Sequence, residues 1–177
     1  MKAVKINLAG RERHLCFTVE AMFQIEERFG GAQELTDTME ANSRIGFEAV
    51  CGAAAILAEQ GELCRRSMGY EPEPLCSAED IAVTIVPTDL ARLKLAVVSA
   101  ITLGYGREIR PENDEVDLGL SELNEQKNKL TRSHYIRIGV LCGLTRRETL
   151  LSTPGEAGDL WELYIQAHQP KRKREDD

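Results

Sequence analysis

The chain has 177 residues, 42% of them hydrophobic, which is enough for one hydrophobic core and a smaller appended unit. Its formal net charge of −7 argues against a protein whose whole surface binds nucleic acid or an anionic membrane. The charge is uneven, because residues 1–128 hold 13 Lys and Arg against 22 Asp and Glu, whereas residues 129–177 hold 9 against 7. The change from a balance of −9 to one of +2 indicates two parts.

The cysteines and the apolar runs favour a soluble intracellular protein. No two of the five cysteines stand in a C-x-x-C pair, and no histidine lies near enough in sequence to complete a zinc site. The odd number and wide spacing favour reduced thiols. The first residues lack the continuous apolar stretch of a signal peptide. The longest apolar run, residues 49–58, is about half the ~20 residues that a membrane span needs.

The N-terminal residues predict a β-hairpin followed by a helix. Apolar and polar residues alternate over residues 4–8 and 14–17, on either side of a turn at Ala9 and Gly10. Thr18 can then cap a helix whose apolar residues recur at spacings of three and four, until Gly30 and Gly31 end it. A lone hairpin is only marginally stable, so we expect this one to pack on the helix that follows it directly.

The middle of the chain predicts three further helices. Residues 43–67 are apolar nearly all round, which is typical of a buried helix, and their small side chains allow close approach of neighbours. Such a helix could also cover a partner's apolar helices, but a core position is the more frequent role. Prolines mark residues 71–74 as a loop. Helices are then predicted from Ser77 to the proline at 87, and over residues 88–104.

The C-terminal part begins with a charged segment. Residues 107–128 contain many charges, one proline and no aromatic residue, which predicts a solvated linker. Three consecutive helices are predicted after it, at 131–142, 146–151 and 154–168. Gly143 provides the left-handed end of the first, and S/T-x-x-E capping boxes begin the other two. These boxes are Thr145 with Glu148 and Thr153 with Glu156.

The predicted fold is therefore mainly α. An N-terminal β-hairpin packed on a helical body occupies residues 1–106, and the charged linker occupies residues 107–128. A small C-terminal three-helix unit follows at 129–170, and residues 171–177 form a charged tail.

We expect no enzymatic activity, no metal and no cofactor. The chain has neither the G-x-x-x-x-G-K-S/T loop that binds phosphates nor a G-x-G-x-x-G turn after a strand. His14, His134 and His168 fall on three different predicted elements, so we interpret each as a surface residue rather than as a catalytic base. Cys16 lies two residues from His14 but has no evident third partner that would make it a nucleophile.

One alternative interpretation concerns the turn at Gly143. Residues 131–151 are similar to a helix-turn-helix unit, whose second helix would enter a DNA major groove. Arg146 and Arg147 suit that role, but Glu148 does not, and the short second helix offers no Asn or Gln for base edges. A small helical DNA-binding or regulatory protein is thus the alternative, while the leading interpretation involves neither nucleic acid nor membrane.

The order of these elements resembles the tail assembly chaperones of long-tailed bacteriophages and prophages. The resemblance is carried by "GLTRRETLLSTPGEAGDLWELYIQAH" and by the hairpin with "FTVEAMFQIEERFGG", and it is most specific over residues 131–168. It implies a non-enzymatic, mostly helical factor that coats the tape measure protein in the host bacterial cytoplasm and is absent from the mature virion. In many members a ribosomal frameshift appends a C-terminal segment that recruits tail tube protein. The charge break near residue 128 falls where such a junction would lie, although this chain carries both parts in one sequence.

The resemblance implies two partners, the tape measure protein for the body and the tail tube protein for the C-terminal unit, and it leaves a homo-oligomer open. Aromatic residues and Arg carry most of the energy at protein interfaces. The candidate partner-binding residues are Arg146, Arg147, Leu160, Trp161 and Tyr164. Trp161, the only tryptophan, flanks the apolar stripe of the last predicted helix and has two interpretations, a core anchor of the C-terminal helices or a partner contact, of which we favour the core anchor.

Overall fold

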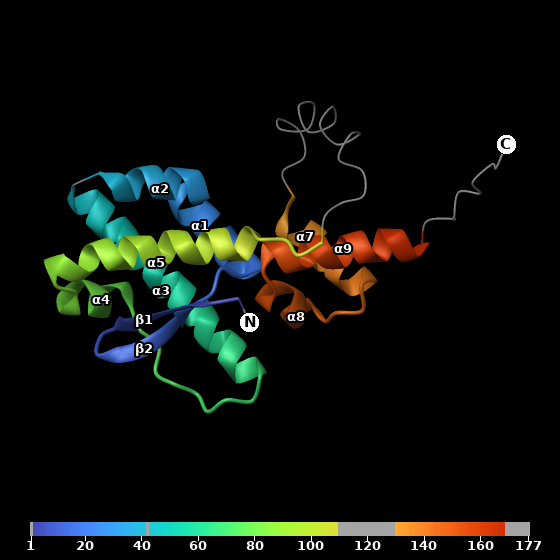
Figure 1. Cartoon of the computed structure of the whole chain (residues 1–177), viewed down its shortest axis with the longest axis horizontal. Helices are drawn as coiled ribbons and strands as arrows, with labels where there is room; N and C mark the ends of the chain where they lie inside the picture. Colours follow the sequence, from blue (N-terminus) through green and yellow to red (C-terminus); the bar gives the residue numbers. More distant parts are fainter. Residues whose placement is uncertain (1, 42, 110–129, 169–177) are drawn as a thin grey trace.

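A computed structural model gives the fold over residues 2–41, 43–109 and 130–168 (Figure 1). Over these residues the protein is mainly α with an N-terminal two-stranded antiparallel hairpin, as the sequence predicts, and it has eight helices, one more than predicted. Residues 110–128 of the predicted linker and the predicted tail at 171–177 lie outside the described residues. The elements are β1 (Val4–Leu8), β2 (Arg11–Leu15), α1 (Val19–Phe29), α2 (Ala32–Glu40), α3 (Arg44–Ser67), α4 (Ala78–Thr84), α5 (Pro87–Tyr105), α7 (Arg132–Leu141), α8 (Arg146–Leu151) and α9 (Pro154–His168).

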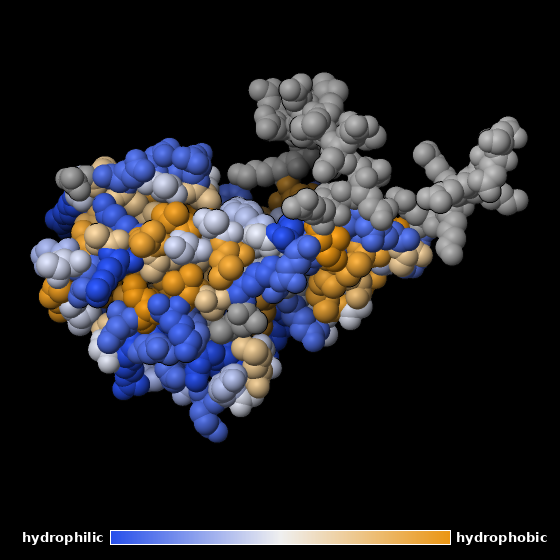
Figure 2. Space-filling model, viewed as in Figure 1, coloured by the Kyte–Doolittle hydropathy of each residue, from blue (hydrophilic) through white to orange (hydrophobic). Residues whose placement is uncertain are grey.

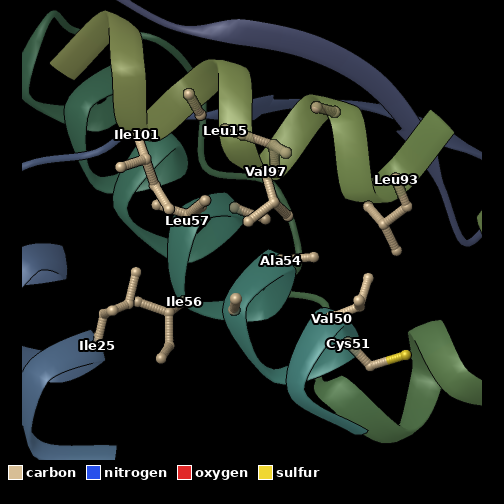
Figure 3. Packing of buried hydrophobic residues seen from close by; sticks show 14 of the residues in the cluster. Leu15, Ile25, Val50, Cys51, Ala54, Ile56, Leu57, Leu93, Val97 and Ile101 are labelled. Atoms are coloured by element: carbon tan, nitrogen blue, oxygen red, sulfur yellow. The ribbon is translucent and has the colours of Figure 1, made fainter. Parts of the chain in front are cut away.

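Helix α3 forms the centre of the body. Val50 and Leu57 of this helix are fully buried, and they pack in one cluster with Leu93 and Val97 of α5 (Figure 3). Helices α1, α2 and α4 and strand β2 cover the remaining sides of α3. The prediction of a buried helix over this segment is confirmed, because most of its residues from Ala49 to Cys64 are buried.

The hairpin lies on the helical body, as predicted, but its contacts are mainly with α3 and α5 rather than with α1, the helix that follows it directly. Its register pairs Val4 with Leu15, and Leu15 is buried in the main cluster. At Gly61 of α3 an added Cβ would overlap the carbonyl oxygen of His14, so a glycine is needed where the strand crosses the helix. The backbone N–H of Cys16, the residue after the strand, donates to the carbonyl oxygen of Leu57 at 3.0 Å. The marginal hairpin thus gains its stability from α3.

Helix α2 is an element that the sequence pattern does not reveal. It has only two buried residues, Leu35 and Met39, and no side chain caps its N-terminus at Gly31. Both buried residues nevertheless belong to the main cluster. Tertiary packing therefore stabilises a helix that local signals leave unmarked.

The boundary between α4 and α5 also differs from the prediction. Helix α4 ends at Thr84, before the proline that was expected to end it, and Pro87 is instead the first residue of α5. Proline suits a first helical position because its missing N–H would have no partner there. The capping box of α4, formed by Ser77 and Asp80, agrees with the predicted helix start.

Candidate interaction surfaces

The three predicted C-terminal helices are present as α7, α8 and α9, and they pack on the body (Figure 1). The backbone N–H of Val19, at the start of α1, donates to the carbonyl oxygen of Ser152 at 2.8 Å. A second buried cluster joins the two parts, formed by Val19, Phe23 and Ala157 with Met22, Tyr135 and Leu150 against it. The division into a body at 1–106 and a C-terminal unit at 129–170 remains a prediction. Helices of both parts contribute to this second cluster.

Asp159 of α9 fixes the chain just after α5. Its carboxylate accepts from the Arg107 guanidinium Nε at 3.1 Å and from the backbone N–H groups of Glu108 at 2.8 Å and Ile109 at 3.3 Å. Burial alone would raise the pKa of Asp159, but the N–H of Glu108 and the Arg107 guanidinium outweigh it and lower the pKa. The first three residues of the predicted linker are therefore attached to α9.

Both predicted capping boxes are confirmed. The Thr145 hydroxyl accepts from the backbone N–H of Glu148 at 3.2 Å, and the Glu148 carboxylate accepts from the backbone N–H of Thr145 at 2.8 Å. Thr153 and Glu156 make the same pair of bonds, at 3.2 Å and 2.8 Å. Helices α8 and α9 therefore begin where the sequence places their starts.

Helices α7 and α8 are in close contact. Gly143 has the predicted left-handed conformation, with φ of 86°, and the N–H of Leu144 donates to the carbonyl oxygen of Gly139 at 2.9 Å. An added Cβ at Gly139 would overlap the Thr149 hydroxyl and lie 2.6 Å from its methyl carbon. Thr149 is buried, so this contact fixes the position of α8 against α7.

A groove of about 400 Å³ lies beside α8, where that helix packs against α1 and α3. We call it the α8 groove. Its leucines are half-buried and form the floor, whereas Arg146 and Arg147 are exposed at the rim. The residues that define it are Glu20, Gln60, Leu63, Arg146, Arg147, Leu150 and Leu151.

The rim of the α8 groove carries uncompensated positive charge. Within residues 2–41, 43–109 and 130–168, neither Arg146 nor Arg147 has an ion-pair partner. Glu20 is the acidic residue of the groove, and its carboxylate instead contacts the Arg132 guanidinium at 2.9 Å. Glu148 is engaged in the cap at Thr145. The groove therefore combines an apolar floor with two free guanidinium groups.

Trp161 lies at the edge of α9 rather than in a core. Its ring stacks on Tyr164, with centroids 5.6 Å apart and an interplanar angle of 10°, and Tyr164 stacks on His168 at 4.1 Å. Trp161 and Tyr164 are half-buried, and neither belongs to the two buried clusters of the described residues. The structure thus places Trp161 outside the buried clusters, whereas a core anchor is the interpretation favoured from the sequence.

The five candidate residues do not line a common groove. Arg146 and Arg147 line the α8 groove, which includes no residue of α9. Leu160 is half-buried, and its carbonyl oxygen contacts the Cys142 thiol just after α7 at 3.5 Å. Sequence reasoning missed Leu63, because nothing local marks a residue of α3 as a neighbour of α8.

Exposed apolar side chains occur on both parts of the molecule. Figure 2 shows hydrophobic residues over α5 and again over α9, with hydrophilic residues between them. Leu95, on the outer side of α5, is 68% exposed. On the C-terminal helices, Val140 is 57% exposed and Leu163 is 49% exposed. The body and the C-terminal helices thus present separate apolar surfaces.

No known protein family, curated protein or solved structure matches the chain. Among the described residues, no group of three or more His, Cys, Asp or Glu is placed to hold a metal ion. Within the same part of the chain, no helix is both long and apolar enough to cross a membrane.

All five cysteines are free, and the buried sulfurs of Cys16 and Cys64 lie 3.9 Å apart. The hydrogen bond to Cys64, together with burial, raises the pKa of the Cys16 thiol.

Proposed function

We propose that this protein is a tail assembly chaperone of a long-tailed phage or prophage. It is a non-enzymatic factor that binds the tape measure protein and recruits the tail tube protein, in the host cytoplasm and not as part of the virion. The proposal begins from the sequence resemblance. One structural observation supports it: the body and the C-terminal helices each carry exposed apolar side chains, among them Leu95 on α5 and Leu163 on α9. Exposed apolar patches commonly mark contacts with other macromolecules.

The two surfaces suit two different partners. The body carries the acidic balance of the chain, so we expect apolar contact rather than charge to drive its binding of the tape measure protein. We therefore assign that protein to the apolar outer face of α5, around Leu95. The C-terminal helices carry Arg146 and Arg147 together with the stacked rings of Trp161 and Tyr164, and we assign the tail tube protein to them. Arg and aromatic residues are the usual anchors of a protein interface.

Co-expression tests the proposal. The full-length chain, produced with the tape measure protein encoded beside it, should raise the soluble fraction of that protein and should retain tail tube protein in a pull-down. Leu95→Gln should lower the soluble fraction, because it places a polar group on the contact face. Leu75→Gln is the matched control, since Leu75 is 51% exposed in the loop between α3 and α4 and should have no effect. A tape measure protein that stays insoluble beside the wild-type chain would reject the assignment.

The helix-turn-helix alternative is tested in the same preparation. Helix α8, which would enter the DNA groove, has only six residues, and its face at Thr149 is buried against α7. Its exposed basic groups are Arg146 and Arg147. Non-specific DNA affinity is greatest at low salt. A duplex shift at low salt would therefore favour the alternative, whereas no shift together with binding of tape measure protein would exclude it.

A further inference from the structure

We infer that the α8 groove binds a helical segment that carries an apolar stripe flanked by acidic residues. The inference rests on the proposed function only in assigning that segment to the tail tube protein. The binding chemistry comes from the groove itself.

The shape of the groove fits one face of a helix. Leu63, Leu150 and Leu151 form an apolar floor between α1, α3 and α8, and Leu150 also packs against the second buried cluster. Grooves between helices receive amphipathic helices through apolar side chains that recur every three or four residues. A volume of about 400 Å³ provides room for several such side chains.

The charges at the rim select acidic flanks. Arg146 and Arg147 have no ion-pair partner among the described residues, while the groove's own Glu20 is held by Arg132. Carboxylates on either side of an apolar stripe would pair with these guanidinium groups, often through two parallel hydrogen bonds. A segment with basic flanks would instead meet like charge. The local preference is opposite to that of the whole chain, whose net charge of −7 attracts cations.

The backbone that carries the two arginines is held before any partner arrives. The capping box of Thr145 and Glu148 fixes the start of α8, and the contact between Gly139 and Thr149 fixes the helix against α7. A site that is already ordered loses less conformational entropy on binding.

Two designed helical peptides of about 20 residues test the inference. They share the same leucine stripe, one with Glu and one with Lys at the flanking positions, and they are titrated into the full-length protein by fluorescence anisotropy. The acidic peptide should bind more tightly despite the net negative charge of the protein. The double variant R146E/R147E should weaken this binding on the order of tenfold.

The double variant R11E/R137E is the matched control. Both residues are exposed, and this variant changes the net charge by the same amount without altering the groove. It should bind the acidic peptide nearly as well as the wild type. Equal binding of the two peptides, no binding of either, or acidic binding that survives R146E/R147E would overturn the inference.

A pull-down of tail tube protein separates this inference from the proposed function. Loss of tube protein from R146E/R147E but not from R11E/R137E supports both, provided that the two variants unfold at the wild-type temperature. Wild-type protein that binds the acidic peptide but no tube protein rejects the proposed partner and leaves the groove chemistry standing. Tube protein that binds R146E/R147E as it binds the wild type rejects the groove as the tube site.

Discussion

Asp159→Ala should destabilise the whole molecule, because Asp159 joins α9 to the end of α5. The buried carboxylate accepts three hydrogen bonds, from the side chain of Arg107 and the backbone of Glu108 and Ile109. Each bond to a charged group contributes roughly 1.5–3 kcal/mol. Arg107 and Glu108 are exposed and regain water in the variant, so we expect a net loss of about 2–3 kcal/mol. For a chain of this size that loss lowers Tm by roughly 5–10 °C.

Thermal unfolding followed by circular dichroism measures the effect, with Asp37→Ala as the control. Asp37 is exposed, and within the described part of the chain its side chain hydrogen-bonds to Gln33 alone, one turn earlier, so its replacement should change Tm little. The folded pKa of Asp159 lies below its ordinary value, so its contribution is complete above about pH 4 and disappears as the pH falls through the folded pKa. The difference between wild type and Asp159→Asn should therefore vanish in acid. A Tm for Asp159→Ala equal to that of the wild type would refute the proposed attachment.

Three further substitutions probe the C-terminal helices. Gly139→Ala should cost about 1–3 kcal/mol, because the added methyl group overlaps Thr149 and must separate α7 from α8; unchanged unfolding would show that these helices do not touch. Thr153→Ala should lower the free energy of unfolding in urea by about 1 kcal/mol, since it removes the side chain that caps α9. Ser67→Ala, at the end of α3, is the control, and an equal effect there would argue against a specific cap. Trp161→Ala should abolish tube binding in a pull-down while Tm changes little, because the ring lies outside both buried clusters; melting of the C-terminal helices would instead assign it a structural role.

Local signals are sufficient for much of this fold. The alternation around Ala9 and Gly10, the cap at Thr18 and the capping boxes at Thr145 and Thr153 each act within a few residues, and each is present in the structure. Helix starts depend on such short-range hydrogen bonds, which is why they can be read directly from the chain. The buried character of α3 follows in the same way from its composition.

Tertiary contacts decide the remainder, and the sequence carries no local sign of them. Helix α2 depends on Leu35 and Met39 reaching a core formed by other elements. The attachment of residues 107–109 depends on Asp159, about fifty residues later. No periodicity links residues so far apart.

The candidate site likewise combines residues that the sequence identifies with an arrangement that only tertiary contacts define. Arg146 and Arg147 were singled out from residue type alone, but the groove that they border depends on Leu63 of α3, which no pattern near α8 identifies. Glu20 of the groove pairs with Arg132, 112 positions away, and among the described residues neither Arg146 nor Arg147 has an acidic partner. Residue chemistry therefore suggests contacts, whereas the three-dimensional arrangement defines the surface that makes them.

Electron microscopy of particles from the parent phage, with this gene deleted and then restored, tests the central claim most directly. Deletion of the gene should give capsids without tails, and supply of the full-length chain in trans should restore complete tails. Purified wild-type virions should contain none of the protein. Normal tails in the deletion strain, or stoichiometric amounts of the protein in purified virions, would contradict its role as an assembly chaperone.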